Sequence, residues 1–273
     1  MAYADEIDPT SSILAYYATK LRTARETAGM SQRDLAKRAL ISPSLLNKVE
    51  AARRLPSLEL SIAADREFSL GDQFESLFPL VIKHAYPPWF RPYVELEAAA
   101  RIVRAFESQV VSGLLQTENY NRAILTGARL DTDAVEDGLA LRRQRQLLLA
   151  KPKPPELWIM LDENVLRRHV GGPKVMRAQL ERLLAAAETP TTVVQVVPYS
   201  AGSHAGVDGS FTVLTLDEGP DVVAVEGFQH GALLAETEQV RAAYRAYDLL
   251  TAVALSPQAS IDLIAATAKE LGT

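Results

Sequence analysis

The sequence predicts an N-terminal, all-α domain of about five helices and a C-terminal α+β domain with a small sheet flanked by helices. At 273 residues, the chain is longer than a typical single domain. Apolar residues recur every three or four positions in its first third, whereas short β-branched runs alternate with helical stretches in its last half. We expect a disordered tail over 1–11, the first domain over 12–83, a linker over 84–94 and the second domain over 95–273.

Apolar stripes predict the first, fourth and fifth helices of the N-terminal domain. The first stripe ends before Gly29 and consists of Leu14, Tyr17, Leu21, Ala24 and Ala28. Ser57 caps the fourth helix, and the fifth contains Phe74, Leu77, Phe78 and Val81. In the proline-rich linker, Trp89 and Phe90 either stack on nucleic acid or pack the linker against a neighbour, and we favour packing.

Two short helices joined by a tight turn lie between the first and fourth helices. Ser31 and Ser42 precede them, and each can accept from the free N–H groups that open a helix. The inward-facing residues of the pair are Leu35, Ala36, Leu46 and Val49. The outward-facing residues of the second helix are Ser44, Asn47 and Lys48. This layout is that of a helix-turn-helix, whose second helix enters the major groove of DNA.

Basic residues concentrate in the same region. The chain has 29 Lys and Arg against 34 Asp and Glu, a net charge of −5. Residues 20–54 hold nine basic and three acidic residues, so this window carries +6 and the remainder −11. A basic patch on an acidic body is an electrostatic footprint for the phosphates of a nucleic acid.

The N-terminal domain resembles the lambda-repressor-like (XRE-type) DNA-binding family. The resemblance rests on Ser31-Gln32, Leu35-Ala36, Ile41-Ser42, Ser44, Val49-Glu50 and the run from Arg53 to Ser57. With the charge pattern, it implies DNA contacts from Gln32, Arg33, Ser42, Ser44, Asn47, Lys48, Arg53 and Arg54. Leu40 stands where the family usually has a turn glycine, so a left-handed backbone there is strained. Pro43 donates no hydrogen bond at a position often used to read bases.

The second domain is predicted to alternate helices and strands. We expect helices over 95–106, 117–125, 134–149, 176–187, 236–255 and 257–271. We expect strands over 157–161, 192–197, 210–216 and 222–225. The last two strands are joined by the turn sequence Asp217-Glu-Gly-Pro220.

This domain resembles the C-terminal domain of WhiJ-like regulators of filamentous actinobacteria. The phrases that carry the resemblance include Gly113-Leu-Leu-Gln-Thr117, Arg142-Arg-Gln-Arg145, Val196-Val-Pro198, Ala201-Gly-Ser-His-Ala-Gly206 and Asp208-Gly-Ser-Phe211. The resemblance implies a transcriptional regulator that is often paired with a small partner protein. It supplies no ligand and no reaction.

Catalysis has few candidates in this sequence. Ser203, His204 and Asp208 share a glycine-rich loop, but adjacent serine and histidine side chains rarely converge, and no G-x-S-x-G nucleophile elbow is present. We favour a glycine-rich loop that links two strands and is capped by its own polar groups. A ligand or partner contact from His204 and Asp208 is the alternative, and it ranks above catalysis. Arg143 and its neighbouring arginines either hold an anion or form the charged face of a long helix, and we favour the charged face.

Cofactor and metal sites have no support in the sequence. The chain contains no cysteine and no phosphate-binding G-x-x-x-x-G-K-[ST] loop, and Glu163 and His169 lack the spacing of a helical metal pair. We therefore expect no enzyme, no cofactor and no metal. With no signal peptide and no run of about 18 apolar residues, the sequence predicts a cytoplasmic protein that does not enter the membrane.

The combined hypothesis is a DNA-binding transcriptional regulator. Double-stranded DNA is the expected partner of the first domain. We expect the second domain to form a homodimer, to sense a ligand or small partner protein, or both. The alternative is an antitoxin-like interaction protein that sequesters a small cognate partner encoded nearby and binds DNA weakly or in a modulated way.

Overall fold

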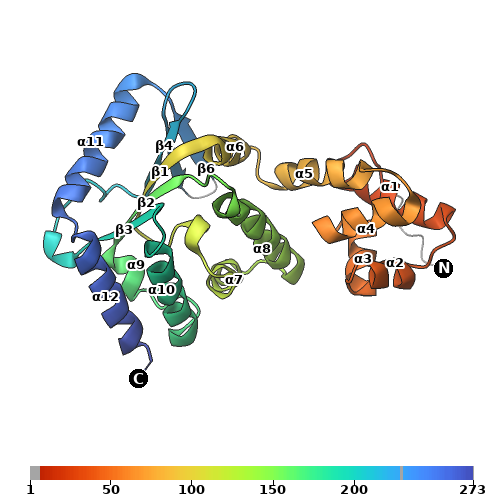
Figure 1. Cartoon of the computed structure of the whole chain (residues 1–273), viewed down its shortest axis with the longest axis horizontal. Helices are drawn as coiled ribbons and strands as arrows, with labels where there is room; N and C mark the ends of the chain where they lie inside the picture. The colour runs from red at the N-terminus through yellow and green to blue at the C-terminus, as the bar shows by residue number, and fades with distance from the viewer. Residues whose placement is uncertain (1–6, 228–229, 273) are drawn as a thin grey trace. The chain divides into compact units, whose positions relative to one another are not determined.

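The computed structural model describes residues 7–227 and 230–272, which form two compact units (Figure 1). Among these residues, the first unit comprises 7–91 together with 131–141, and the second comprises 92–130 and 142–272. Of the tail expected over 1–11, residues 1–6 lie outside the described residues.

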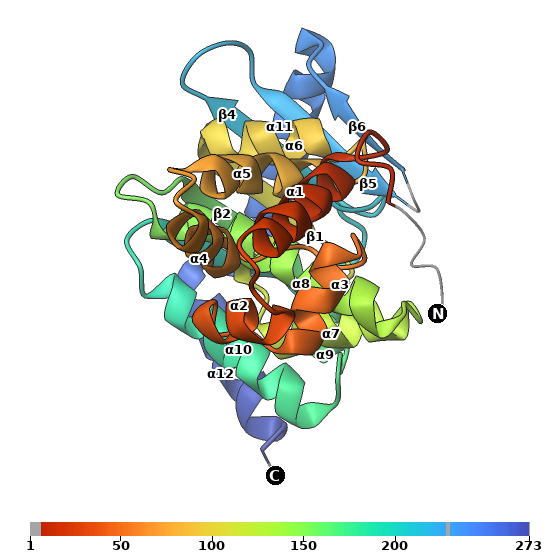
Figure 2. The same cartoon turned by 90° about the vertical axis from the view of Figure 1, so that its right-hand side faces the viewer.

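Five helices of the first unit follow the predicted order (Figure 2). They are α1 (Ile13–Thr27), α2 (Gln32–Arg38), α3 (Pro43–Glu50), α4 (Leu58–Phe68) and α5 (Gln73–Ala85). The predicted capping serines are confirmed: the hydroxyls of Ser31, Ser42 and Ser57 each accept from the backbone N–H three residues further on. Each cap satisfies one of the donors that a helix leaves free at its start.

The core of this unit packs α1 against α4 and α5. The rings of Tyr17 and Phe74, both fully buried, meet edge to face with centroids 5.1 Å apart. The Tyr17 hydroxyl is 2.8 Å from Ser61 Oγ, so it keeps a hydrogen-bond partner inside the core. The buried Asp65 carboxylate accepts from the backbone N–H groups of Phe74 and Glu75, at 2.9 and 2.8 Å. Asp65 of α4 therefore caps the start of α5.

The second unit is built on a six-stranded mixed sheet in the order β3-β2-β1-β4-β5-β6. Its strands are β1 (Ala100–Glu107), β2 (Glu156–Asp162), β3 (Thr192–Val197), β4 (Phe211–Leu216), β5 (Val222–Gly227) and β6 (His230–Leu234). β1 to β3 are mutually parallel, and β4 to β6 run as antiparallel neighbours. β1 is the junction, with β2 parallel on one side and β4 antiparallel on the other.

Helices flank this sheet, as the predicted α+β class requires (Figure 1). They are α6 (Arg91–Ala99), α7 (Glu118–Gly127), α9 (Glu163–Arg167), α10 (Pro173–Ala187), α11 (Thr237–Val253) and α12 (Pro257–Glu270). Tyr247 and Leu250 of α11 pack on Phe106, Met160 and Val197 of the three parallel strands. α8 (Thr132–Gln146) supplies its first ten residues to the first unit and its last five to the second.

The prediction of a helix over 95–106 is wrong in its second half. α6 ends at Ala99, and residues 100–107 form β1, the strand at the centre of the sheet. Arg101, Arg104 and Glu107 recur every third position, which fits one face of a helix as well as it fits this strand, so the sequence pattern does not separate the two. Backbone pairing with β2 and β4 makes the segment a strand. β6 and α9 are additional to the predicted elements.

No single helix among the described residues is long and apolar enough to cross a bilayer. Within the part of the chain that the structure describes, α11 and α12 pass that test of length and composition only when taken together, and they are bent by 70° at the break between them.

Candidate nucleic-acid interface

The turn between α2 and α3 has the left-handed residue that the sequence analysis expected at Leu40. Its φ is +56°, and its side chain is 93% exposed. The N–H of Ile41 donates to the Ala36 carbonyl at 3.0 Å, which closes the C-terminus of α2. Gly29 closes α1 in the same way, with a φ of +63° and the Met30 N–H donating to the Arg25 carbonyl. Leu40 therefore adopts a backbone conformation that favours glycine, and the burial of its side chain contributes no stability to offset the strain.

A buried ion pair orients α3 against α1. Glu50 is completely buried, and its two carboxylate oxygens accept from Arg25 Nε at 2.6 Å and from Arg25 Nη2 at 2.8 Å. The hydrogen bonds that Arg25 donates to Glu50 are the main reason that the pKa of Arg25 lies above its usual value. Gln32 Nε2 also donates to Glu50, and Arg22 donates to its backbone carbonyl, both within 2.8 Å. We call Arg25 and Glu50 the inner ion pair; the sequence analysis assigned neither residue a role.

The proposed DNA contacts divide into exposed and half-buried side chains. Arg33, Ser42, Ser44, Asn47 and Arg53 are exposed, whereas Gln32, Lys48 and Arg54 are half-buried. The described geometry thus leaves one side of α3 open, opposite the buried Leu46 and Val49.

Ser42, Gln32 and Asn47 have polar partners within the helix-turn-helix itself. Ser42 Oγ accepts from the Leu45 N–H, so this hydroxyl caps α3 while its own proton stays available to an acceptor. Gln32 Nε2 donates to the Glu50 carboxylate, and Gln32 Oε1 accepts from Asn47 Nδ2 at 3.4 Å. Gln32 therefore links the inner ion pair to the exposed side of α3.

Acidic residues of α8 lie against the cations at the end of α3. Lys48 Nζ is 2.7 Å from Asp133 Oδ1, and Arg54 Nε is 2.8 Å from Asp137 Oδ1. Asp137 also accepts from the Leu55 N–H at 3.1 Å. The hydrogen bond from Lys48 is the main reason that the pKa of Asp133 is lowered. We call Lys48–Asp133 and Arg54–Asp137 the outer ion pairs.

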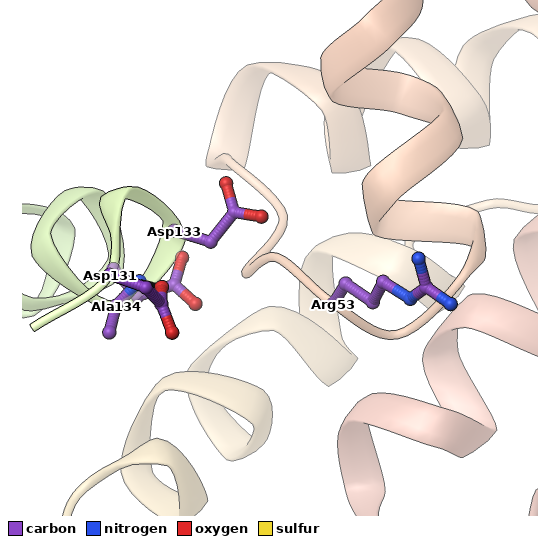
Figure 3. A pocket seen from close by; sticks show the side chains of 5 residues that line it. Arg53, Asp131, Asp133 and Ala134 are labelled. Atoms are coloured by element: carbon purple, nitrogen blue, oxygen red, sulfur yellow. Dashed lines mark hydrogen bonds between the residues drawn. The ribbon is translucent and has the colours of Figure 1, made fainter.

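A cavity of about 400 Å³ adjoins the outer ion pairs (Figure 3). It is lined by Arg53, Asp131, Asp133, Ala134 and Asp137, all of the first unit. Figure 3 shows the carboxylates of Asp131 and Asp133 extending from the α8 segment and Arg53 extending from the loop after α3. The outer ion pairs therefore border open space.

The ligand-contact candidates of the second unit have separate partners. His204 Nε2 is 3.3 Å from Asp162 Oδ2, while its Nδ1 accepts from the Gly206 N–H at 3.2 Å. Both ring nitrogens are thus engaged, and the histidine holds its own loop to the end of β2. Asp208 is exposed in the same loop, and Arg143 pairs with Glu118 at 2.9 Å on the surface.

Arg145 departs from the charged helix face that the sequence suggested. Its guanidinium is almost fully buried and pairs with Glu97, whose Oε1 accepts from Arg145 Nη2 at 2.7 Å. The guanidinium also lies over the ring of Tyr93, 5.1 Å from the centroid. A buried arginine needs a partner of opposite charge, so this cluster stabilises the packing of α6 and the end of α8.

Glu107, at the end of β1, lies in the same electrostatic environment. Burial, reinforced by the charge of Glu226, raises the pKa of Glu107 to about 8, while Arg145 and Arg142 oppose the shift. Burial also raises the pKa of Glu226. Over the described residues, no group of three or more His, Asp or Glu side chains is arranged to hold a metal ion.

Two family models match the chain. A helix-turn-helix domain matches residues 17–68, and a domain of unknown function (DUF5753) matches residues 90–266. Neither the curated proteins nor the solved structures yielded a match. The first match identifies a DNA-binding domain of the kind that regulators carry, and it points away from an enzyme. The second covers more than half of the sequence, so the chain belongs to the DUF5753 family.

Proposed function

We propose that this protein is a transcriptional regulator that binds double-stranded DNA through the exposed side of α3. The observation that carries the proposal is the continuity of Ser44, Asn47, Lys48 and the Arg53-Arg54 pair around one end of the helix-turn-helix. The +6 charge of residues 20–54 supports it, because phosphate contacts supply most of the non-specific affinity for DNA.

Within this proposal the residues have different tasks. Lys48, Arg53 and Arg54 contact phosphates, and Arg33 and Gln32 contact the backbone at the start of α2. Ser42, Ser44 and Asn47 face base edges, where an asparagine side chain suits adenine. Because Pro43 has no donor, discrimination between sequences depends mainly on Asn47.

The second unit serves regulation in this proposal. One helix-turn-helix reads a single half-site, so a homodimer would double the contact area. Arg143, His204 and Asp208 are offered as contacts to an effector or a small partner protein. Analytical ultracentrifugation of the full chain, alone and with the product of a neighbouring gene, measures both forms of association.

The decisive experiment selects bound duplexes from a random library with the full-length chain and measures their affinity against salt. The proposal expects an enriched sequence motif and an affinity that falls steeply as salt rises. If no sequence motif is enriched at any salt concentration and the chain forms a tight complex with a neighbouring gene product, the antitoxin-like alternative is favoured instead.

A further inference from the structure

The segment of α8 that belongs to the first unit is acidic. Residues 131–137, which we call the acidic segment, contain Asp131, Asp133, Glu136 and Asp137 and no basic residue. Asp131 caps the helix, because its carboxylate accepts from the Ala134 N–H at 2.8 Å. Asp133 and Asp137 are directed at the helix-turn-helix instead, through the outer ion pairs.

The contacts made by these two carboxylates are of the kind that DNA phosphates make. Phosphate oxygens accept from lysine, arginine and backbone N–H groups. Asp133 accepts from Lys48 and lies 3.7 Å from Arg54 Nη1, while Asp137 accepts from Arg54 Nε and from the Leu55 N–H. Lys48 and Arg54 therefore bind the carboxylates of the acidic segment, although the proposed function requires them to bind phosphates.

Helix stability alone does not account for this arrangement. The helix dipole favours an acidic residue in the first turn of a helix. This explains Asp133, but it does not explain Asp137, which lies one turn later. Two carboxylates four residues apart lie on the same side of a helix and repel each other. The repulsion is offset only because Lys48 and Arg54 lie opposite them.

We propose that the acidic segment is an intramolecular phosphate mimic, which occupies Lys48 and Arg54 and lowers the affinity for DNA until it withdraws. This inference rests on the proposed function. The contact is suited to exchange, since the side chains of Lys48 and Asp133 are 40% and 30% exposed and a cavity of about 400 Å³ adjoins them. A solvated ion pair such as Lys48–Asp133 is individually weak, and phosphates can displace it. The Arg54–Asp137 pair is less exposed, at 14% and 24%, so it makes the larger contribution to holding the acidic segment in place.

The test compares the full-length wild-type chain with the double variant Asp133→Asn/Asp137→Asn. The amide at position 137 retains an oxygen for the Leu55 N–H, so the variant removes charge and keeps shape. We expect its dissociation constant for a selected duplex to be about tenfold lower. The slope of log affinity against log salt should stay close to the wild-type slope, because Lys48 and Arg54 reach phosphates in both chains once the acidic segment has withdrawn.

The matched control is Asp217→Asn/Glu218→Gln, which removes the same two charges from an exposed turn of the second unit. We expect it to change affinity less than twofold, and thermal unfolding should show that both variants remain folded. If the acidic-segment variant binds no tighter than the control while the wild-type chain binds DNA, the mimic is refuted and the proposed function stands. If none of the three chains binds any duplex, both proposals fail.

Discussion

The inner and outer ion pairs sit at opposite sides of α3 and differ in burial. The inner pair, Arg25–Glu50, has a carboxylate with no exposure, and Gln32 satisfies it further. In the outer pair Lys48–Asp133, both side chains remain substantially exposed. A buried charge that loses its partner stays desolvated, whereas an exposed charge recovers water. Ion pairs at the two sides of α3 therefore have different effects: the buried pair stabilises the fold, and the exposed pair can exchange its partner.

Removing the carboxylate of the inner ion pair should have the largest effect on stability. Glu50→Gln removes the buried counter-charge of Arg25 and leaves it the longer contact to the exposed Glu26, at 3.4 Å, so we expect a cost of about 3–5 kcal/mol in the free energy of unfolding. Urea denaturation of the full-length variant measures this loss. The comparison variant Asp133→Asn, in the exposed outer pair, should cost less than about 1 kcal/mol. Equal losses in the two variants would show that the two sides of α3 do not differ.

Removing the cations of the outer ion pairs should act on DNA binding instead. Lys48→Ala and Arg54→Ala should each weaken binding to every duplex and reduce the salt slope by about 0.9, since each deletes one phosphate contact. Asn47→Ala should leave that slope unchanged and narrow the difference in affinity between matched and mismatched sites. Fluorescence anisotropy across a salt series measures both quantities. The control Lys153→Ala removes an exposed charge from the second unit and should change neither the salt slope nor the difference between sites. If Lys48→Ala binds DNA as the control does, Lys48 does not belong to the interface.

The helix C-termini at Gly29 and Leu40 offer a sharper comparison of backbone strain, because both residues are left-handed in the same kind of turn. Leu40→Gly should raise the free energy of unfolding by about 0.5–1 kcal/mol, since the exposed side chain contributes no burial. Gly29→Ala should lower it by about 1 kcal/mol, although a Cβ there would meet no atom within 4 Å. Opposite signs in urea denaturation support strain as the cause, and a loss of stability in Leu40→Gly would contradict it.

Glu107 is a partly buried carboxyl group that favours its protonated form. Its pKa of about 8 exceeds the ordinary value of 4.5, so between these values the folded chain keeps a proton that the unfolded chain has lost. This group therefore contributes stability at low pH that disappears as the pH rises through about 8. Glu107→Gln should flatten the fall of the melting temperature between pH 5 and pH 8.5. Parallel melting curves for the wild type and the variant over that range would contradict the assignment.

The predictable parts of this protein were those with local signals. Serine caps and three- to four-residue spacing located the five N-terminal helices, because a helix closes its hydrogen bonds within itself. The left-handed turn at Leu40 was expected from the family resemblance, which places a glycine there, rather than from a local signal. The strand at 100–107 was misassigned, because its charged residues recur every third position as they would on a helix, and only pairing with β2 and β4 identifies the strand.

Sequence reasoning could not find the electrostatic relations between distant residues. The amino-acid order specified where the chain turns, which residues are apolar and where basic side chains accumulate, since these depend on neighbours a few positions away. Only the folded chain joined Arg25 to Glu50, buried Arg145 against Glu97, and set Asp133 and Asp137 against Lys48 and Arg54, more than 80 positions apart. Such pairings follow from how the helices pack, and packing is a property of the whole core rather than of any local stretch.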